Sequence, residues 1–335
     1  MTVTAVDPAA LAEGVLAGNR RAVARAITLV ESMRPDRREP AKELLRRIAP
    51  ATGGAVRVGI SGIPGAGKST TIDALGQRLI DAGHRVGVVA VDPSSARTGG
   101  SILGDRTRMG ALAARDEAFV RPSPTGDHLG GVARATRESM LVLEAAGYDV
   151  VVVETVGVGQ SEVAVAGMVD TFLLLGLARG GDQLQGIKRG ILEMADVVAI
   201  NKADGDHAPE ARVAARDLRQ ALHLMRPEDT PVVLTCSAVT GDGLDELWQA
   251  VLDHREGLVS AGRLETRRAA QQRDWMWSMV DAELRAAART TPSVAEGRGA
   301  WEGAVTRGEL DATEAAARVI EALREDWTAA TRHRR

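Results

Sequence analysis

The chain has 335 residues, a formal net charge of −3 and one cysteine. The near-neutral charge gives no electrostatic reason to expect binding to nucleic acid or to an anionic membrane. Cys236 alone cannot form an intramolecular disulfide, no apolar run approaches the ~20 residues of a membrane span, and Met1 does not begin a basic-then-apolar leader. We therefore expect a cytoplasmic protein, built as one large domain with extensions or as two small domains.

Residues 1–52 are predicted to form a helical N-terminal extension. Asp7 and Pro8 match the N-cap and the first position of a helix. Apolar residues then follow at helical spacing on a single stripe: Leu11, Val15, Leu16, Val23, Ile27 and Val30. A second, short helix is predicted over residues 41–48.

Residues 53–258 alternate between short apolar, β-branched runs and amphipathic helical stretches. Near-continuous Val, Ile and Leu strands are typical of a parallel sheet that is covered by helices on both faces. This pattern predicts an α/β fold with a doubly wound, mostly parallel sheet. The predicted strands are residues 56–60, 86–91, 150–153, 172–177, 197–200 and 232–234.

A glycine-rich loop follows the first predicted strand and opens a helix. Residues 62–69, GIPGAGKS, match the G-x-x-x-x-G-K-[ST] loop of P-loop NTPases at every fixed position. Backbone N–H groups of such a loop surround phosphate oxygens, while Lys68 reaches the β- and γ-phosphates and Ser69 ligates magnesium. The chain has only four lysines against 38 arginines, and a compact ammonium suits this position better than a planar guanidinium.

Acidic residues follow two further strand-like segments. Asp92 and Asp105 lie in a long loop after the second predicted strand and are candidate ligands of magnesium or of its water molecules. Arg106 and Arg108 are candidates for stabilising transition-state charge, although surface ion pairs explain them equally well. Glu154 ends the strand at 150–153, where most GTPases carry an aspartate of the magnesium shell.

The sequence Asn201-Lys202-Ala203-Asp204 ends another predicted strand, and Ser237-Ala238 follows the next one. The Asp204 carboxylate can accept hydrogen bonds from both N1–H and the exocyclic amine of guanine. Adenine would leave this charge unpaired, at a cost of about 3–5 kcal/mol, which corresponds to a roughly hundred- to thousandfold preference for GTP. The N–H of Ala238 is expected to contact the guanine carbonyl.

Residues 259–335 carry no strand pattern. Two helices are predicted at about 262–289 and 309–330, joined by a turn region that contains Pro, Ser and Gly. Two explanations for its aromatic residues remain open, packing against the α/β domain and a subunit interface. Four of the five tryptophans lie here: Trp275, Trp277, Trp301 and Trp327.

The chain resembles the G-protein chaperones of cobalamin-dependent acyl-CoA mutases, the methylmalonyl-CoA mutase accessory GTPases once labelled arginine/lysine transport ATPases. The resemblance covers about residues 10–255 and implies a homodimer with a C-terminal helical dimerisation segment. It also implies that GTP hydrolysis gates the loading of adenosylcobalamin into a B12-dependent mutase and the removal of damaged cofactor. The motifs that carry it occur in the order GIPGAGKST, VDPSS, GGSILGDRTRM, ETVGVGQSE, GDQLQGIKRGI and NKAD.

The same resemblance implies roles for individual residues. The loop at 178–189 would convey the nucleotide state to the mutase, with Asp182 and Lys188 as participants. Magnesium would be organised by Ser69, Asp92, Asp105 and Glu154, which act with Lys68 in catalysis. The residues that would bind GTP or GDP are Gly62, Gly65, Ala66, Gly67, Lys68, Ser69, Thr70 and Gly157 at the phosphates, and Asn201, Lys202, Asp204, Ser237 and Ala238 at guanine.

Two other classes of protein share parts of this pattern. A nickel-insertion accessory GTPase would need a cluster of metal-binding His or Cys residues, whereas the six histidines here are scattered. A transport-associated ATPase or kinase would not need the N-K-x-D sequence. Competition between ATP and GTP separates this last class from a GTPase.

Overall fold

The computed structural model describes residues 6–91, 109–122, 129–155, 160–178 and 189–332. It divides the chain into two compact units, Met1–Gln271 and Gln272–Arg335. The first unit contains all the strands of the described residues, and the second is helical.

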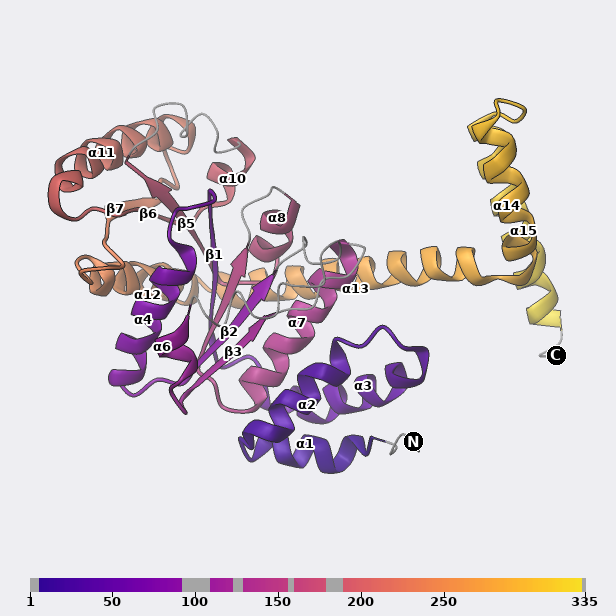
Figure 1. The fold of residues 1–335 in the computed structure, drawn as a ribbon, viewed down its shortest axis with the longest axis horizontal. Coiled ribbons are helices and arrows are strands. Elements are labelled where there is room, and N and C mark those ends of the chain that lie inside the picture. The colour runs from indigo at the N-terminus through magenta and orange to yellow at the C-terminus, as the bar shows by residue number, and fades with distance from the viewer. Residues whose placement is uncertain (1–5, 92–108, 123–128, 156–159, 179–188, 333–335) are drawn as a thin grey trace. The chain divides into compact units, whose positions relative to one another are not determined.

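Seven described strands form one parallel sheet in the order β3-β2-β4-β1-β5-β6-β7 (Figure 1). This arrangement confirms the predicted α/β fold. The short strand β3 was not predicted, because its sequence AFVRP lacks a run of β-branched residues and ends in proline. The strands are β1 (Val56–Gly62), β2 (Val86–Val91), β3 (Ala118–Pro122), β4 (Val150–Thr155), β5 (Thr171–Leu177), β6 (Val197–Asn201) and β7 (Val232–Thr235).

Helices cover both faces of this sheet, so the interior strands β2 and β4 are buried along their whole length. On one face lie α4 (Lys68–Asp81), α6 (Gly110–Ala113) and α12 (Leu244–Ser260). The opposite face packs against α7 (Leu129–Ala145), α8 (Gln160–Ala166), α10 (Arg189–Met194) and α11 (Ala208–Met225). The first unit also contains two short 3₁₀ turns, Ala49–Ala51 and Gly205–His207.

The N-terminal extension forms three helices, α1 (Pro8–Leu16), α2 (Arg20–Val30) and α3 (Pro35–Ile48), where one stripe and one short helix were predicted. The stripe is broken because Asn19 starts a new helix, accepting hydrogen bonds from the N–H groups of Arg21 and Ala22. The second helix starts at Pro35 rather than at residue 41, and it tolerates Pro40 inside it.

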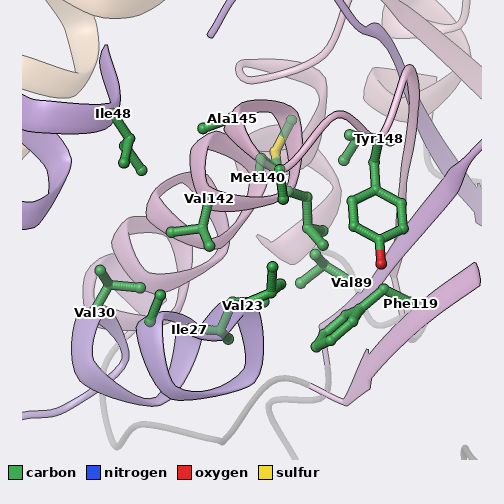
Figure 2. Packing of buried hydrophobic residues seen from close by; sticks show 14 of the residues in the cluster. Val23, Ile27, Val30, Ile48, Val89, Phe119, Met140, Val142, Ala145 and Tyr148 are labelled. Carbon is green, nitrogen blue, oxygen red and sulfur yellow. The ribbon is translucent and has the colours of Figure 1, made fainter. Parts of the chain in front are cut away.

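These N-terminal helices share a core with α7. Figure 2 shows Val23, Ile27 and Val30 of α2 beside Val142 of α7. The same cluster continues to the sheet through Phe119 and Tyr148, whose rings meet edge to face at 6.1 Å between centroids. The N-terminal extension is therefore part of the same hydrophobic core as the α/β domain.

One buried ion pair joins the first turns of α13 (Arg263–Thr290) to the start of the sheet, and a second buried pair, between β1 and α7, lies beside it. Arg268 binds both carboxylate oxygens of Asp170, at 2.8 and 2.7 Å, and its other donors reach the carbonyl oxygens of Gly53 and Ala55. Asp170 Oδ2 also accepts from the N–H of Arg57, and the Arg57 guanidinium pairs with Glu144. The Asp170 side chain is 0% exposed, so its charge depends on these donors.

The second unit contains the remainder of α13 together with α14 (Pro292–Thr306) and α15 (Ala312–Arg332). Helix α14 occupies the predicted turn region, with Pro292 at its start and Ser293 bonded through its N–H and hydroxyl to Asp326 of α15. Among the described side chains of this unit, the buried hydrophobics are Val294 and Leu323. Large apolar side chains are instead exposed: Met276, Trp277, Val280, Leu284, Ile320 and Trp327.

Among the described helices, none combines the length and the apolar content that crossing a bilayer requires.

Replacing Arg268 with alanine should lower the free energy of unfolding of the first unit by about 3–5 kcal/mol, because it leaves the buried Asp170 carboxylate without its cation. Urea denaturation followed by circular dichroism measures this change. Arg273→Ala is the matched control, since Arg273 lies on the same helix in an exposed pair with Asp274 and should cost at most about 1 kcal/mol. Equal midpoints for the two variants would contradict the role of the buried pair.

Candidate functional site

The glycine-rich loop connects β1 to α4 and places Lys68 at the first position of the helix. Its ammonium donates to the carbonyl oxygens of Gly62, at 2.8 Å, and Ile63, at 3.2 Å. The lysine is only 8% exposed although it carries a charge. The loop therefore holds this charge in a fixed place where backbone N–H groups at a helix start also favour an anion.

Gly67 has a backbone conformation and an environment that exclude a side chain. Its φ is +89°, and a Cβ there would lie 2.5 Å from Nδ2 of Asn201. The Asn201 amide uses this space to donate to the Ala66 carbonyl oxygen at 2.8 Å and to the Thr71 hydroxyl at 3.3 Å. The phosphate loop is thus fastened to the end of β6, 134 residues away in the chain from Gly67.

Ser69 and Glu154 lie together at the same edge of the sheet. β4 pairs with β1 so that Glu154 stands opposite Ile60, and the Ser69 hydroxyl donates to Glu154 Oε1 at 2.7 Å. Both side chains line a cavity of about 610 Å³ that is also lined by Lys68, Thr70 and Lys202.

This pair fits a magnesium ion held beside nucleotide phosphates. Mg²⁺ prefers oxygen ligands and takes only one or two protein side chains when phosphates and waters complete its shell. The Ser69 hydroxyl and the Glu154 carboxylate both offer oxygen atoms as metal ligands, and the fold holds these oxygens 2.7 Å apart. Among the described residues there is no larger His, Cys, Asp or Glu cluster of metal-binding type.

Loops after β6 and β7 meet to form the second half of the site. Asp204 Oδ1 accepts from the Ser237 hydroxyl at 2.7 Å, and the N–H of Ala203 donates to the Cys236 carbonyl oxygen at 3.0 Å. Lys202 adopts φ +61°, the only positive φ of a non-glycine residue in the described chain. Such strain is typical of residues that a surrounding structure holds for function.

Asn201 also orders the loop that follows β7. Its Oδ1 accepts from the N–H of Ala238 at 3.2 Å and from the Cys236 thiol at 3.7 Å. In this structure the Ala238 N–H is therefore bonded to Asn201, so contact with a guanine carbonyl requires that the bond be shared or exchanged. Cys236 is buried, and burial raises the pKa of its thiol to about 12.

The structure brings most of the predicted site residues to one edge of the sheet, in two groups that share Asn201. Sequence reasoning missed Thr71, whose hydroxyl donates to the Gly67 carbonyl oxygen at 2.9 Å and accepts from Asn201. A second threonine after the G-K-S-T motif gave no signal for this role. Several predicted residues lie outside the described ranges: Asp92, Asp105, Arg106, Arg108, Gly157, Asp182 and Lys188.

Comparison with known proteins finds similar sequences and a similar fold. A solved structure described as LAO/AO transport system kinase superposes with a TM-score of 0.73 at 37% identity, covering 96% of this chain and 100% of that one. A probable GTPase of Mycobacterium tuberculosis is 58% identical over 314 residues, 93% of this chain and 94% of that protein. The mouse mitochondrial methylmalonic aciduria type A homolog is 43% identical over 327 residues, covering 93% and 78% of the two chains.

The family described as Methylmalonyl Co-A mutase-associated GTPase MeaB matches residues 23–293. This match spans the glycine-rich loop, the loops after β6 and β7, and all seven described strands. The chain is therefore a GTPase with a P-loop NTPase fold, and it belongs to the family of methylmalonyl-CoA mutase-associated GTPases.

Proposed function

We propose that this GTPase is a chaperone of a cobalamin-dependent acyl-CoA mutase, such as methylmalonyl-CoA mutase, and that GTP hydrolysis gates the loading of adenosylcobalamin and the exchange of damaged cofactor. The observation that supports nucleotide binding is the Asn201 side chain. Its hydrogen bonds connect the glycine-rich phosphate loop to the loops after β6 and β7, which we call the guanine loops. The family description, which names the mutase, supports the partner. The buried, lone Cys236 suits work in a reducing cytoplasm.

Guanine recognition is assigned to Asp204, with Asn201, Lys202, Ser237 and Ala238 holding the surrounding loops. The hydrogen bond from Ser237 fixes one carboxylate oxygen of Asp204, so the orientation of the group is set before a base arrives. A preorganised carboxylate avoids the cost of ordering a side chain on binding.

Phosphate binding is assigned to the loop that contains Gly62, Gly65, Ala66, Gly67 and Thr70, with Gly157 toward the γ-phosphate. Lys68 is held by two carbonyl oxygens and therefore presents its charge without searching rotamers. A bound Mg²⁺ would neutralise charge that develops on the phosphates. The residues that would hold it are Ser69 and Glu154, together with Asp92 and Asp105.

The mutase-coupling role is assigned to the segment 178–189, which follows β5. β5 is hydrogen-bonded to β1, the strand that runs into the phosphate loop, so its end lies at the nucleotide edge of the sheet. Asp182 and Lys188 are proposed to carry the nucleotide state from this edge to the mutase.

A homodimer formed through the second unit completes the proposal. The described side chains of this unit bury only Val294 and Leu323 while exposing Trp277, Leu284 and other large apolar groups. Burial of two hydrophobic side chains does not offset the conformational entropy lost when three helical segments are ordered. Contact with the same surface of a second copy would bury the exposed apolar side chains.

Asp204→Asn should weaken GTP binding by at least about a hundredfold and shift preference toward xanthine nucleotides, because the amide cannot accept from both guanine donors. The variant oxygen can still accept from Ser237, so the loop should keep its shape. Competition with fluorescent GDP measures the change, and Asp206→Asn in the adjacent 3₁₀ turn is the matched control. Equal affinity of the unmodified protein for ATP and GTP would contradict guanine recognition.

Turnover of the isolated protein should be slow, about 10⁻⁴ to 10⁻² per second on the scale of unassisted GTPases, and a cognate cobalamin mutase should accelerate it. Asp182→Ala and Lys188→Ala should reduce the stimulated rate and leave the basal rate nearly unchanged. Lys42→Ala, which removes a surface lysine of α3, controls for loss of charge alone. If a mutase neither binds nor stimulates the protein, the chaperone function is wrong.

Truncation after Gln272 should convert dimers into monomers while the first unit stays folded, because Arg268 and Gln271 remain to close the base of the sheet. Light scattering measures the mass, and circular dichroism checks the fold. In the full chain, Leu284→Glu should weaken the same association by charging an exposed apolar position. Dimers of the truncated chain would place the interface in the first unit.

A further inference from the structure

The loop between β7 and α12, residues 236–243, is closed by its own hydrogen bonds. The N–H of Ser237 donates to the Asp242 carbonyl oxygen at 2.8 Å, and the N–H of Gly241 donates to the Ser237 carbonyl oxygen at 2.9 Å. The Ser237 hydroxyl accepts from two further N–H groups of the loop, at 3.3 and 3.2 Å, and donates to Asp204 Oδ1 at 2.7 Å. The orientation of the Asp204 carboxylate therefore depends on the shape of this loop.

Arg78, in the last turn of α4, holds the loop from outside. Its guanidinium donates to the Gly241 carbonyl oxygen at 3.1 Å and to both carboxylate oxygens of Asp245, at 3.0 and 2.9 Å. Asp245 lies in the first turn of α12, the helix that follows the loop. One side chain thus joins both the loop and the next helix to α4, a task that suits the several donors of a planar guanidinium.

The loop leaves room for this guanidinium at Gly241. This residue has φ +84°, a backbone conformation that residues with a side chain rarely adopt. A Cβ built there would also clash with the guanidinium of Arg78. The arginine therefore lies directly against the backbone of the loop, in addition to pairing with Asp245.

The helix that carries Arg78 also begins the phosphate site. Arg78 lies ten residues after Lys68, or about 15 Å along the helix. Helices α4 and α12 lie side by side on one face of the sheet (Figure 1), and Leu79 and Leu247 belong to the same buried cluster. Helix α4 is thus a connection between the phosphate loop and the loop after β7 that is separate from Asn201.

The contacts of Arg78 orient the loop more than they stabilise the fold. The side chains of Arg78 and Asp245 are 40% and 76% exposed. Exposed ion pairs contribute little to folding, because solvent screens them and two long side chains lose entropy when they pair. Replacing Arg78 should therefore leave the protein folded, with a melting temperature within about 4 °C of the unmodified protein.

We propose that Arg78 is a positioning residue for guanine recognition, which holds the loop after β7 in the arrangement where Ser237 orients Asp204. The inference rests on the proposed assignment of guanine to Asp204. Arg78 acts through Gly241 and Asp245 and does not touch the base in this scheme. Its loss should weaken recognition of the base and spare the binding of the phosphates.

The test measures how GDP and ADP displace a fluorescent GDP from full-length variants in the presence of Mg²⁺. ADP depends on the phosphate loop but offers Asp204 neither of the two guanine donors. In Arg78→Ala the dissociation constant for GDP should rise about 3- to 10-fold while that for ADP changes less than about twofold, because only the base-binding loop loses its order before binding. The preference for GDP over ADP should therefore fall by the factor that GDP affinity loses.

Three further variants separate positioning from loss of charge. Arg78→Lys keeps the charge without the fork and should restore part of the GDP affinity. Asp245→Ala leaves the bond from Arg78 to Gly241 in place, so it should weaken GDP in the same direction but less. Arg115→Ala is the matched control and should leave GDP affinity unchanged, because Arg115 is similarly exposed, at 38%, but pairs with Asp81 at the end of α4.

The outcomes are distinct. Unchanged GDP affinity in Arg78→Ala overturns the positioning role, as does an equal loss of GDP and ADP affinity together with a lower melting temperature. A loss in Arg115→Ala that matches the loss in Arg78→Ala would trace the effect to surface charge and overturns it too. Equal affinity of the unmodified protein for GDP and ADP overturns the proposed guanine recognition instead.

Discussion

Hydrogen bonds of one buried amide hold the nucleotide site together. Asn201 donates to the Ala66 carbonyl oxygen and the Thr71 hydroxyl, and its own oxygen accepts from the N–H of Ala238. Because the side chain is 1% exposed, each of these groups would lack water if the amide were removed. The glycine-rich loop, the start of α4 and the loops after β6 and β7 thus share one set of hydrogen bonds, and a displacement of any of them disturbs the others. Gly67 is glycine because this amide needs the space.

Arginine and lysine side chains have different electrostatic roles in this structure. The planar forks of Arg57 and Arg268 pair with buried carboxylates and backbone carbonyls at the base of the sheet, where several fixed donors are needed at once. Lys68 is held by two carbonyl oxygens at the opposite edge and acts as a compact charge. Arg57 and Arg268, two of the 38 arginines, therefore have a structural role, and the rare lysine at the glycine-rich loop has a different one.

The fold could be predicted where local pattern and tertiary environment agree. Val/Ile/Leu runs predicted six strands correctly, because strands buried on both faces need no alternation. The strand at Ala118–Pro122 was missed because it is short and carries Arg121 and Pro122. The region of α14 was predicted to be a turn because it contains Pro, Ser and Gly, yet Pro292 starts a helix there and contacts with α15 stabilise it. The site was predicted in outline by motif order, whereas the φ of Lys202 and the bond from Ala238 to Asn201 depend on loops distant in sequence.

Cys236 allows the opening of the loops after β6 and β7 to be measured kinetically. Cys236 is only 1% exposed, its thiol donates to Asn201 Oδ1, and burial raises the pKa of the thiol to about 12. Alkylation therefore has to wait for the loops to part, so the rate at which a thiol reagent consumes this one sulfur reports the free energy of local opening. A bound nucleotide that bridges the loops would slow the reaction by the same factor by which it suppresses the open state. No label or substitution is needed, since the chain carries a single cysteine.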